Sequence, residues 1–116
     1  MKHNLFTTPL WHIEDEIPQS LIDELYQGAY QFKENHKSTN VSNKGGYQTP
    51  TFDWKYFHPQ GTEYINKIVD DIFKYPGHSF SVKVESWWYN INGKGHWNTP
   101  HTHPNSDFAL VLYLTD

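Results

Sequence analysis

The order of the sequence patterns predicts a mixed α+β fold in which two helices precede the strands. Apolar residues recur at helical spacing in residues 18–34 and again in residues 61–74. Downstream, residues 79–88 alternate between apolar and polar side chains, and residues 108–114 form a continuous apolar run. Both patterns are typical of strands. The 116 residues suffice for one small domain with a modest core.

The first helix is expected to follow a short extended segment. Residues 5–13 contain Thr, Trp and Ile, which favour a strand, and Pro9 indicates a strand at a sheet edge. Asp15, Glu16 and Pro18 then favour a helix start, because acids and proline suit the first turn. The helix carries one apolar stripe that we interpret as core: Leu21, Ile22, Leu25, Tyr26, Ala29 and Phe32.

A long polar segment separates this helix from the second one. Residues 35–51 are polar and contain Gly45 and Gly46, which predicts a loop. The second helix should run over residues 61–74, and Pro76 with Gly77 should end it. Its buried face is expected to comprise Tyr64, Ile65, Ile68, Val69, Ile72 and Phe73.

The remainder of the chain should consist of strands and turns. Residues 92–95 read Asn-Gly-Lys-Gly and predict a turn, residues 96–103 are polar and extended, and residues 105–107 predict another turn. Residues 108–114 should then form a buried strand. If that strand lay at a sheet edge, it would favour pairing with another chain, including a second copy of this one.

Composition excludes several functional classes. The net charge is −4 and the chain has no Arg, which argues against nucleic acid or an anionic membrane surface as a partner. The absence of Cys excludes disulfides and thiolate sites. No apolar run reaches the length of a membrane span, so a cytoplasmic protein is expected. Neither a Gly-x-Ser-x-Gly motif nor a phosphate-binding loop is present.

The sequence His101-Thr102-His103 is the strongest candidate for chemistry. On an extended backbone, residues i and i+2 project to the same side, about 7 Å apart along the strand. Neutral imidazoles at this spacing can bind one divalent metal ion. Such pairs also occur on ordinary surfaces, and the chain has eight His. The isolated His residues are expected to be surface or capping groups, whereas His96 lies close to the pair.

The sequence around the pair resembles a family of 2-oxoglutarate/Fe(II)-dependent oxygenases found in marine bacteria and their phages. The similar features are Trp88-Tyr89-Asn90, a glycine turn, His101-Thr102-His103-Pro104 and the aromatic-containing strand that ends at Tyr113-Leu114. The upstream segment of residues 42–46, which reads Ser-Asn-Lys-Gly-Gly, is also similar. The resemblance covers most of the chain, and its specific part spans residues 87–114.

The resemblance implies a double-stranded β-helix, which is a jelly roll, with helices packed outside. It implies Fe(II) and 2-oxoglutarate as cofactors, with His101 and His103 as metal ligands. The implied reaction decarboxylates 2-oxoglutarate to succinate and hydroxylates a C–H bond of a small molecule or a side chain. Candidates for the cofactor pocket wall on the neighbouring strands are Tyr89, Asn90, Asn92 and Tyr113.

The chain differs from this pattern in two respects. The wider superfamily more often has His-x-Asp than His-x-His, and we expect Asp107 to be a turn residue rather than a ligand. A jelly roll has eight strands, whereas three or four candidates are present. No basic residue follows Lys94 to bind the far carboxylate of 2-oxoglutarate. We therefore expect a single domain, residues 1–116, that is the N-terminal part of a jelly roll. Three alternatives follow: the part is inactive alone, a partner chain completes its sheet, or the fold is reduced to one that binds without turnover.

Two alternatives remain open on the sequence. Gly95, five residues and then His101-Thr102-His103 is similar to the first motif of cupins, which share the jelly-roll architecture. Alternatively, the chain is a binding module without catalysis, in which Trp87, Trp88 and Trp97 stack on a sugar or a peptide. Such a module would bind its ligand without metal.

Overall fold

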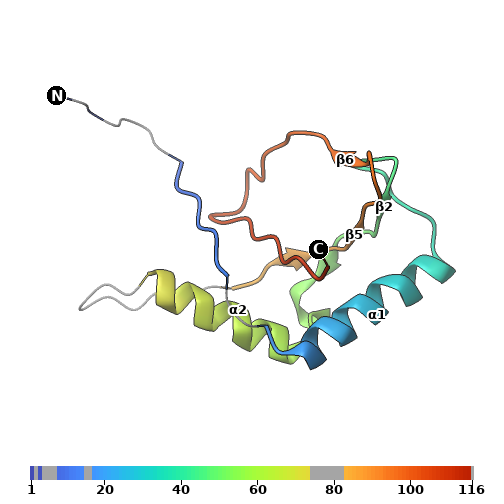
Figure 1. Ribbon diagram of the computed structural model, residues 1–116, viewed down its shortest axis with the longest axis horizontal. Coiled ribbons are helices and arrows are strands. Elements are labelled where there is room, and N and C mark those ends of the chain that lie inside the picture. The colour runs from blue at the N-terminus through green and yellow to red at the C-terminus, as the bar shows by residue number, and fades with distance from the viewer. Residues whose placement is uncertain (2, 4–7, 15–16, 74–82, 116) are drawn as a thin grey trace.

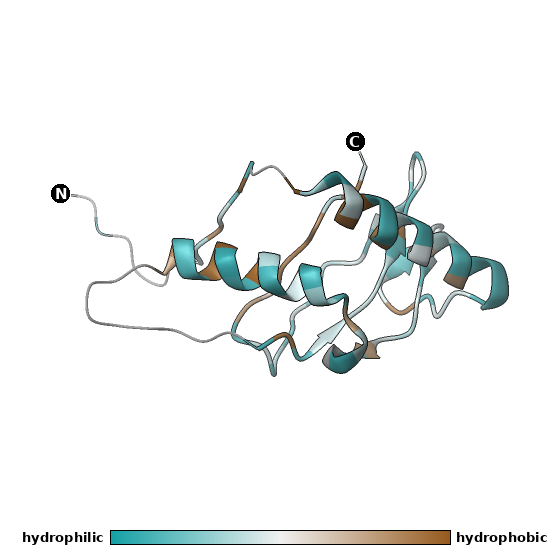
Figure 2. Ribbon diagram, turned by 90° about the horizontal axis from the view of Figure 1, so that it is seen from below, coloured by the Kyte–Doolittle hydropathy of each residue, from teal (hydrophilic) through white to brown (hydrophobic). Residues whose placement is uncertain are grey.

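The computed structural model describes residues 1, 3, 8–14, 17–73 and 83–115. Two helices and three short antiparallel strand pairs make a mixed α+β arrangement, which confirms the predicted fold class at that level. In Figure 1 the helices lie along one side of the molecule and the strand pairs lie beside the C-terminal half of α1. Both helices carry apolar residues interspersed with hydrophilic ones (Figure 2).

Helix α1, Gln19–Asn35, forms where the first apolar stripe predicted it. The carbonyl oxygen of Pro18 accepts hydrogen bonds from the backbone N–H groups of Leu21 (2.9 Å) and Ile22 (3.2 Å), which starts the helical ladder. The helix ends at His36, whose backbone is extended. Its buried face consists of Leu21, Leu25 and Ala29, and Ile22 and Phe32 are half-buried, so most of the stripe packs as core. Tyr26 is exposed, so its assignment to the core is wrong.

Helix α2, Pro59–Ile72, confirms the second predicted helix and starts two residues earlier than expected. Proline occupies its first turn, where a missing backbone N–H costs nothing. The residues buried on this helix are Gly61, Ile65 and Ile68. Just before α2, the His58 ring contacts the Glu24 carboxylate of α1, which joins the two helices.

The strands form a two-stranded antiparallel ribbon, by which we mean residues 43–53 paired with residues 86–98. Its strand pairs are β1 (Asn43–Lys44) with β6 (Trp97–Asn98), β2 (Tyr47–Gln48) with β5 (Asn90–Ile91), and β3 (Phe52–Asp53) with β4 (Ser86–Trp87). The prediction of a loop over residues 35–51 is therefore wrong at residues 43–44 and 47–48, which are in strands. Three two-residue strands leave no periodicity that could have indicated them.

The register of the ribbon explains where its turn lies. Asn43 is opposite Asn98 and Tyr47 is opposite Ile91. Residues 92–96 therefore face only residues 45–46, and the longer side must loop outward. The predicted turn at residues 92–95 lies within this loop, where Gly95 has a φ of +83°. A 3₁₀ turn, Trp54–Tyr56, connects the ribbon to α2.

Three other strand predictions have different outcomes. Residues 108–114 pair with no strand in the described part of the chain, and they are mostly exposed, with only Leu112 and Leu114 half-buried. Residues 8–13 are also outside any strand, and the earlier part of that prediction lies outside the described residues. Of the long strand expected over 79–88, the described part contains only β4.

Aromatic rings join the helices to the rest of the molecule. Phe32 of α1 contacts Phe52 of the ribbon with ring centroids 5.1 Å apart. Phe73, which follows α2, packs on Phe108 at 5.0 Å and on Trp11 at 5.5 Å. Within residues 17–73 and 83–115, neither helix has the length and apolar character that crossing a membrane requires.

Candidate functional site

His101 and His103 project together, as their spacing predicted. Their ring centroids are 4.8 Å apart and their planes meet at 72°. His101 is exposed, whereas His103 is half-buried, with its ring 5.5 Å from that of Trp88. Nδ1 of His101 donates to the carbonyl oxygen of Thr99 at 2.7 Å. In a neutral ring this bond leaves the lone pair of Nε2 available, which is how backbone carbonyls orient metal-binding imidazoles.

The ribbon holds the chain just before the pair. The backbone N–H of Thr99 donates to the carbonyl oxygen of Ser42 at 2.8 Å, and its hydroxyl donates to the same oxygen at 3.1 Å. Ser42 is itself buried. The two segments that carry the family resemblance, residues 42–46 and 87–103, therefore lie side by side although about fifty residues separate them in sequence.

A buried polar network lies behind this contact. The Gln48 side-chain oxygen accepts hydrogen bonds from the backbone N–H groups of Ser42 (3.1 Å) and Asn43 (3.2 Å). Asn43 is only 1% exposed, and its amide donates to Oδ1 of Asn92 at 2.6 Å. These bonds satisfy two backbone N–H groups and the Asn43 amide N–H, which would be costly to bury unpaired, and they fix the ribbon next to the histidines. Oδ1 of Asn43 has no partner among the described residues.

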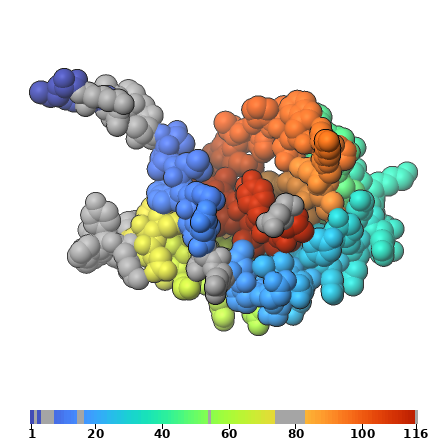
Figure 3. All heavy atoms as spheres, viewed as in Figure 1, coloured from blue at the N-terminus to red at the C-terminus, as the bar shows by residue number. Residues whose placement is uncertain are grey.

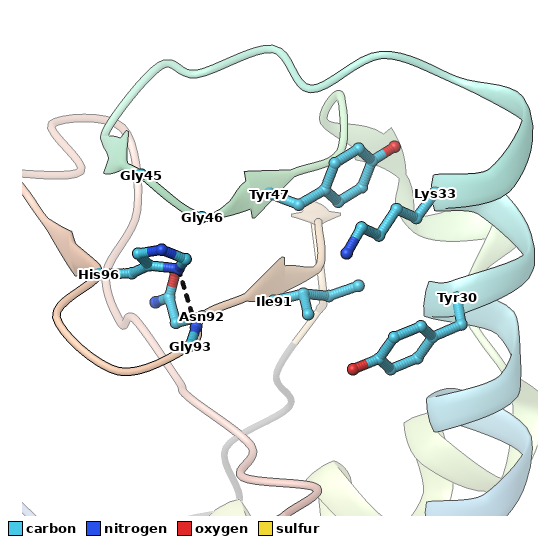
Figure 4. A pocket seen from close by; sticks show the side chains of 9 residues that line it. All are labelled: Tyr30, Lys33, Gly45, Gly46, Tyr47, Ile91, Asn92, Gly93 and His96. Carbon is cyan, nitrogen blue, oxygen red and sulfur yellow. Dashed lines mark hydrogen bonds between the residues drawn. The ribbon is translucent and has the colours of Figure 1, made fainter.

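A pocket of about 440 Å³ opens between α1 and the loop of the ribbon. It is lined by Tyr30 and Lys33 from α1 and by residues 45–47, 91–93 and 96 from the ribbon. Figure 4 shows the Lys33 side chain reaching from the helix toward Tyr47 and Ile91, with His96 on the opposite side. The lining is therefore mixed, with aromatic and aliphatic groups near the helix and polar groups near the loop.

His96 is oriented by the loop that contains it. The backbone N–H of Gly93 donates to Nδ1 of His96 at 2.9 Å (Figure 4). Gly45 has a φ of +87°, and a Cβ at that position would lie 2.8 Å from Cδ2 of His96. The ring thus needs glycine opposite it. Because Nδ1 accepts a hydrogen bond, the proton of the neutral ring is on Nε2, unlike in His101.

The four residues predicted for the cofactor pocket lie in different places. Asn92 lines the pocket, and its Oδ1 accepts from Asn43. Asn90 is exposed in β5, opposite Gln48. Tyr113 is 80% exposed. Tyr89 is directed toward α1, where its hydroxyl lies 3.2 Å from the position of a Cβ on Gly28. Among them, only Asn92 contributes to the pocket.

Tyr89 is half-buried between the ribbon and α1. Its side chain packs edge-on against Trp87 with ring centroids 5.2 Å apart, and its backbone exchanges hydrogen bonds with Thr49. Desolvation raises the pKa of the Tyr89 hydroxyl above its ordinary value, because the charged form is disfavoured away from water. This residue therefore contributes packing between the ribbon and α1.

The described residues supply no complete metal site. Among them, no group of three His, Asp or Glu side chains converges on one point. Asp107 is exposed, after a turn closed by a hydrogen bond of 3.1 Å from the Ser106 N–H to the His103 carbonyl oxygen. His101 and His103 thus fit two positions of a metal coordination shell, and the remaining positions would need other donors.

The sequence reasoning missed the two pocket residues from α1. Tyr30 and Lys33 belong neither to the predicted core stripe nor to a motif. Their place in the pocket becomes clear only from the position of the ribbon beside α1. Gly45 and Gly46 did provide a signal, because adjacent glycines indicate either a turn or a close approach. Here both roles apply.

The comparisons with known proteins give no family for this chain. No family model matches the sequence, and no curated protein or solved structure matches it either.

Proposed function

We propose that this chain provides the two-histidine metal site of a 2-oxoglutarate- and Fe(II)-dependent dioxygenase. The observation that carries the proposal is the geometry of His101 and His103, whose rings lie 4.8 Å apart with Nδ1 of His101 bonded to a backbone carbonyl. This arrangement leaves Nε2 of His101 as a lone-pair donor toward solvent. When bound, Fe(II) would supply the O₂ chemistry that side chains cannot.

The rest of the proposal concerns fold and setting. The ribbon would be part of a jelly roll whose further strands complete the sheets and whose further donors complete the metal shell. Support comes from the pairing of residues 42–44 with residues 97–99, since both segments belong to the family resemblance. Such an enzyme is expected to act in the cytoplasm on a small molecule or a protein side chain.

In this arrangement the residues of the chain have distinct tasks. Ser42 and Thr99 fix the backbone ahead of the pair, and the Thr99 carbonyl sets the ring orientation of His101. Trp88 packs against His103 and limits the positions that its ring can take. Positioned ligands lower the entropic cost of metal binding, because less side-chain freedom is lost when the ion binds.

An anaerobic titration with Fe(II) followed by 2-oxoglutarate tests the proposal. The expected result is a visible charge-transfer band that saturates with 2-oxoglutarate and disappears in His101→Ala. His12→Ala is the matched control, because His12 is also an exposed histidine, with a side chain 84% accessible. It should leave the band unchanged.

Two results would contradict the proposal in different ways. Metal binding that requires His101 but gives no band with 2-oxoglutarate would indicate a cupin-like metal site instead. Absence of metal binding in the native chain would overturn the assignment of the histidine pair itself.

A further inference from the structure

The pocket between α1 and the loop of the ribbon has a consistent hydrogen-bonding polarity. Backbone N–H groups can only donate, so the bond from Gly93 to Nδ1 of His96 places the ring proton on Nε2. The Asn43 amide donates to Oδ1 of Asn92, which leaves the Asn92 amide group as a donor. Lys33 carries three donors and no acceptor. His96, Asn92 and Lys33 therefore each have a hydrogen-bond donor available for a ligand in the pocket.

The charge of the pocket has one sign. Of the nine described residues that line it, none is acidic, and Lys33 provides a full positive charge. The Lys33 ammonium lies 5.6 Å from the ring centroid of Tyr30 and 5.9 Å from that of Tyr47. The two rings hold it over the pocket through cation–π attraction. The negative net charge of the chain is screened beyond about 8–10 Å at ordinary salt.

The volume of the pocket and its apolar lining indicate the size and the apolar part of the ligand. A volume of about 440 Å³ accommodates a small organic molecule rather than a lone ion. Tyr30, Tyr47 and Ile91 offer apolar surface on the helix side, across from His96 and Asn92 (Figure 4). One lysine balances one negative charge, which suits a carboxylate better than a doubly charged phosphate.

We propose that this pocket binds the carboxylate of a small organic acid that has an aromatic or otherwise apolar body. The carboxylate lies between Lys33 and the donors of His96 and Asn92, and the apolar body packs against Tyr30, Tyr47 and Ile91. The site goes beyond the proposed dioxygenase function, because neither His101 nor His103 lines it and its occupancy requires no metal.

Benzoate and its neutral isostere benzamide provide the test, with the full chain kept metal-free by a chelator. Amide NMR signals of residues 45, 46 and 93 should shift saturably with benzoate, whereas benzamide should bind at least about tenfold more weakly because it lacks the charge. Equal binding of the two compounds, or no saturable shift with benzoate, would overturn the proposal.

Two substitutions locate the effect in this pocket. Lys33→Gln should weaken benzoate binding about tenfold, because a charged hydrogen-bond donor is lost. Lys37→Gln is the matched control, with the same loss of charge from an exposed lysine outside the pocket lining, and should change affinity less than about twofold. Unchanged affinity in Lys33→Gln would contradict the site.

A third variant cancels the positive charge of the pocket without removing the internal hydrogen bond. Asn92→Asp keeps an oxygen for the Asn43 amide and places a carboxylate in the pocket, so benzoate binding should be lost. His101→Ala should bind benzoate as the native chain does. This result separates the pocket from the metal site, since either proposal can fail while the other stands.

Discussion

In two regions of this molecule, the burial of the side chains is the opposite of what their polarity favours. Residues 42–49 are mostly polar, yet Ser42, Asn43, Gln48 and Thr49 are all buried. Residues 108–114 are mostly apolar, yet Phe108, Leu110, Val111 and Tyr113 are all exposed. In Figure 3 the C-terminal segment, in red, is visible in the middle of the face turned toward the viewer.

The difference shows that hydrogen-bond partners decide burial as much as hydropathy does. In the polar region, Gln48 alone accepts bonds from two backbone N–H groups through its side chain and from Thr39 through its carbonyl oxygen. Each satisfied group avoids a cost of about 1–3 kcal/mol that it would pay if buried alone. A polar segment can therefore become interior when its partners are placed correctly.

In the part of the chain that the structure describes, residues 108–114 lack hydrogen-bond partners of this kind for their backbone groups. Burial of its side chains would gain free energy, but a strand also needs a neighbour for its backbone groups. In the described chain, only Phe108 at its start makes aromatic contacts, with Trp11 and Phe73. The segment is thus ready to pair and has no partner strand within residues 17–73 and 83–115.

The largest effect is expected from removing the central acceptor of the polar region. Gln48→Met keeps the length of the side chain but leaves the N–H groups of Ser42 and Asn43 without a partner. We expect the free energy of unfolding to fall by about 3 kcal/mol, measured by urea denaturation. Gln27→Met, on the exposed side of α1, should change it by less than about 0.5 kcal/mol. Equal effects would refute the importance of the network.

A somewhat smaller effect should follow from crowding the same network. In Gly46→Ala, the new Cβ would lie 2.2 Å from Oδ1 of Asn92 and 2.7 Å from the backbone oxygen of Ile91. The backbone atom cannot move without breaking the β2–β5 pair, so we expect a loss of about 2 kcal/mol in thermal unfolding.

The matched control for this substitution is Gly93→Ala. Its nearest atom would be Cε1 of His96 at 3.4 Å, which is an ordinary contact. It should therefore be clearly less destabilising than Gly46→Ala. Melting temperatures of both variants equal to that of the native chain would show that Gly46 does not pack closely against Asn92 and Ile91 in solution.

The features that the sequence predicted correctly are local ones. Helices α1 and α2 follow from apolar residues three and four positions apart, and the proximity of His101 and His103 follows from their spacing of two. The ribbon was missed because its partners, such as Asn43 and Asn98, are distant in sequence and its strands are only two residues long. Long-range pairing leaves no periodic signal of this length.

The same reasoning explains the outcome for the candidate pocket residues. Asn92 and Tyr89 are close in sequence, but the ribbon directs one toward the pocket and the other toward Gly28. Lys33 belongs to an exposed helix surface and has no distinguishing neighbours in sequence. Its role depends on which strand passes beside α1, which side-chain chemistry alone does not specify.

The smallest effect on stability is expected in residues 108–114. It tests whether this apolar segment is exposed in solution. Val111 is 72% exposed, so Val111→Ser should change the free energy of unfolding by less than about 0.5 kcal/mol. Leu21→Ala, at a fully buried position of α1, should cost about 3 kcal/mol and shows that the assay detects buried side chains.

The dependence of the melting temperature on protein concentration tests whether two copies pair through residues 108–114. If two copies paired through residues 108–114, as an unpaired apolar edge favours, Val111 would be covered and the melting temperature would rise with concentration. Val111→Ser would then destabilise the native chain by much more than 0.5 kcal/mol and reduce that dependence. A small, concentration-independent effect means that the segment stays exposed in the isolated chain, because hydropathy without a backbone partner does not bury it.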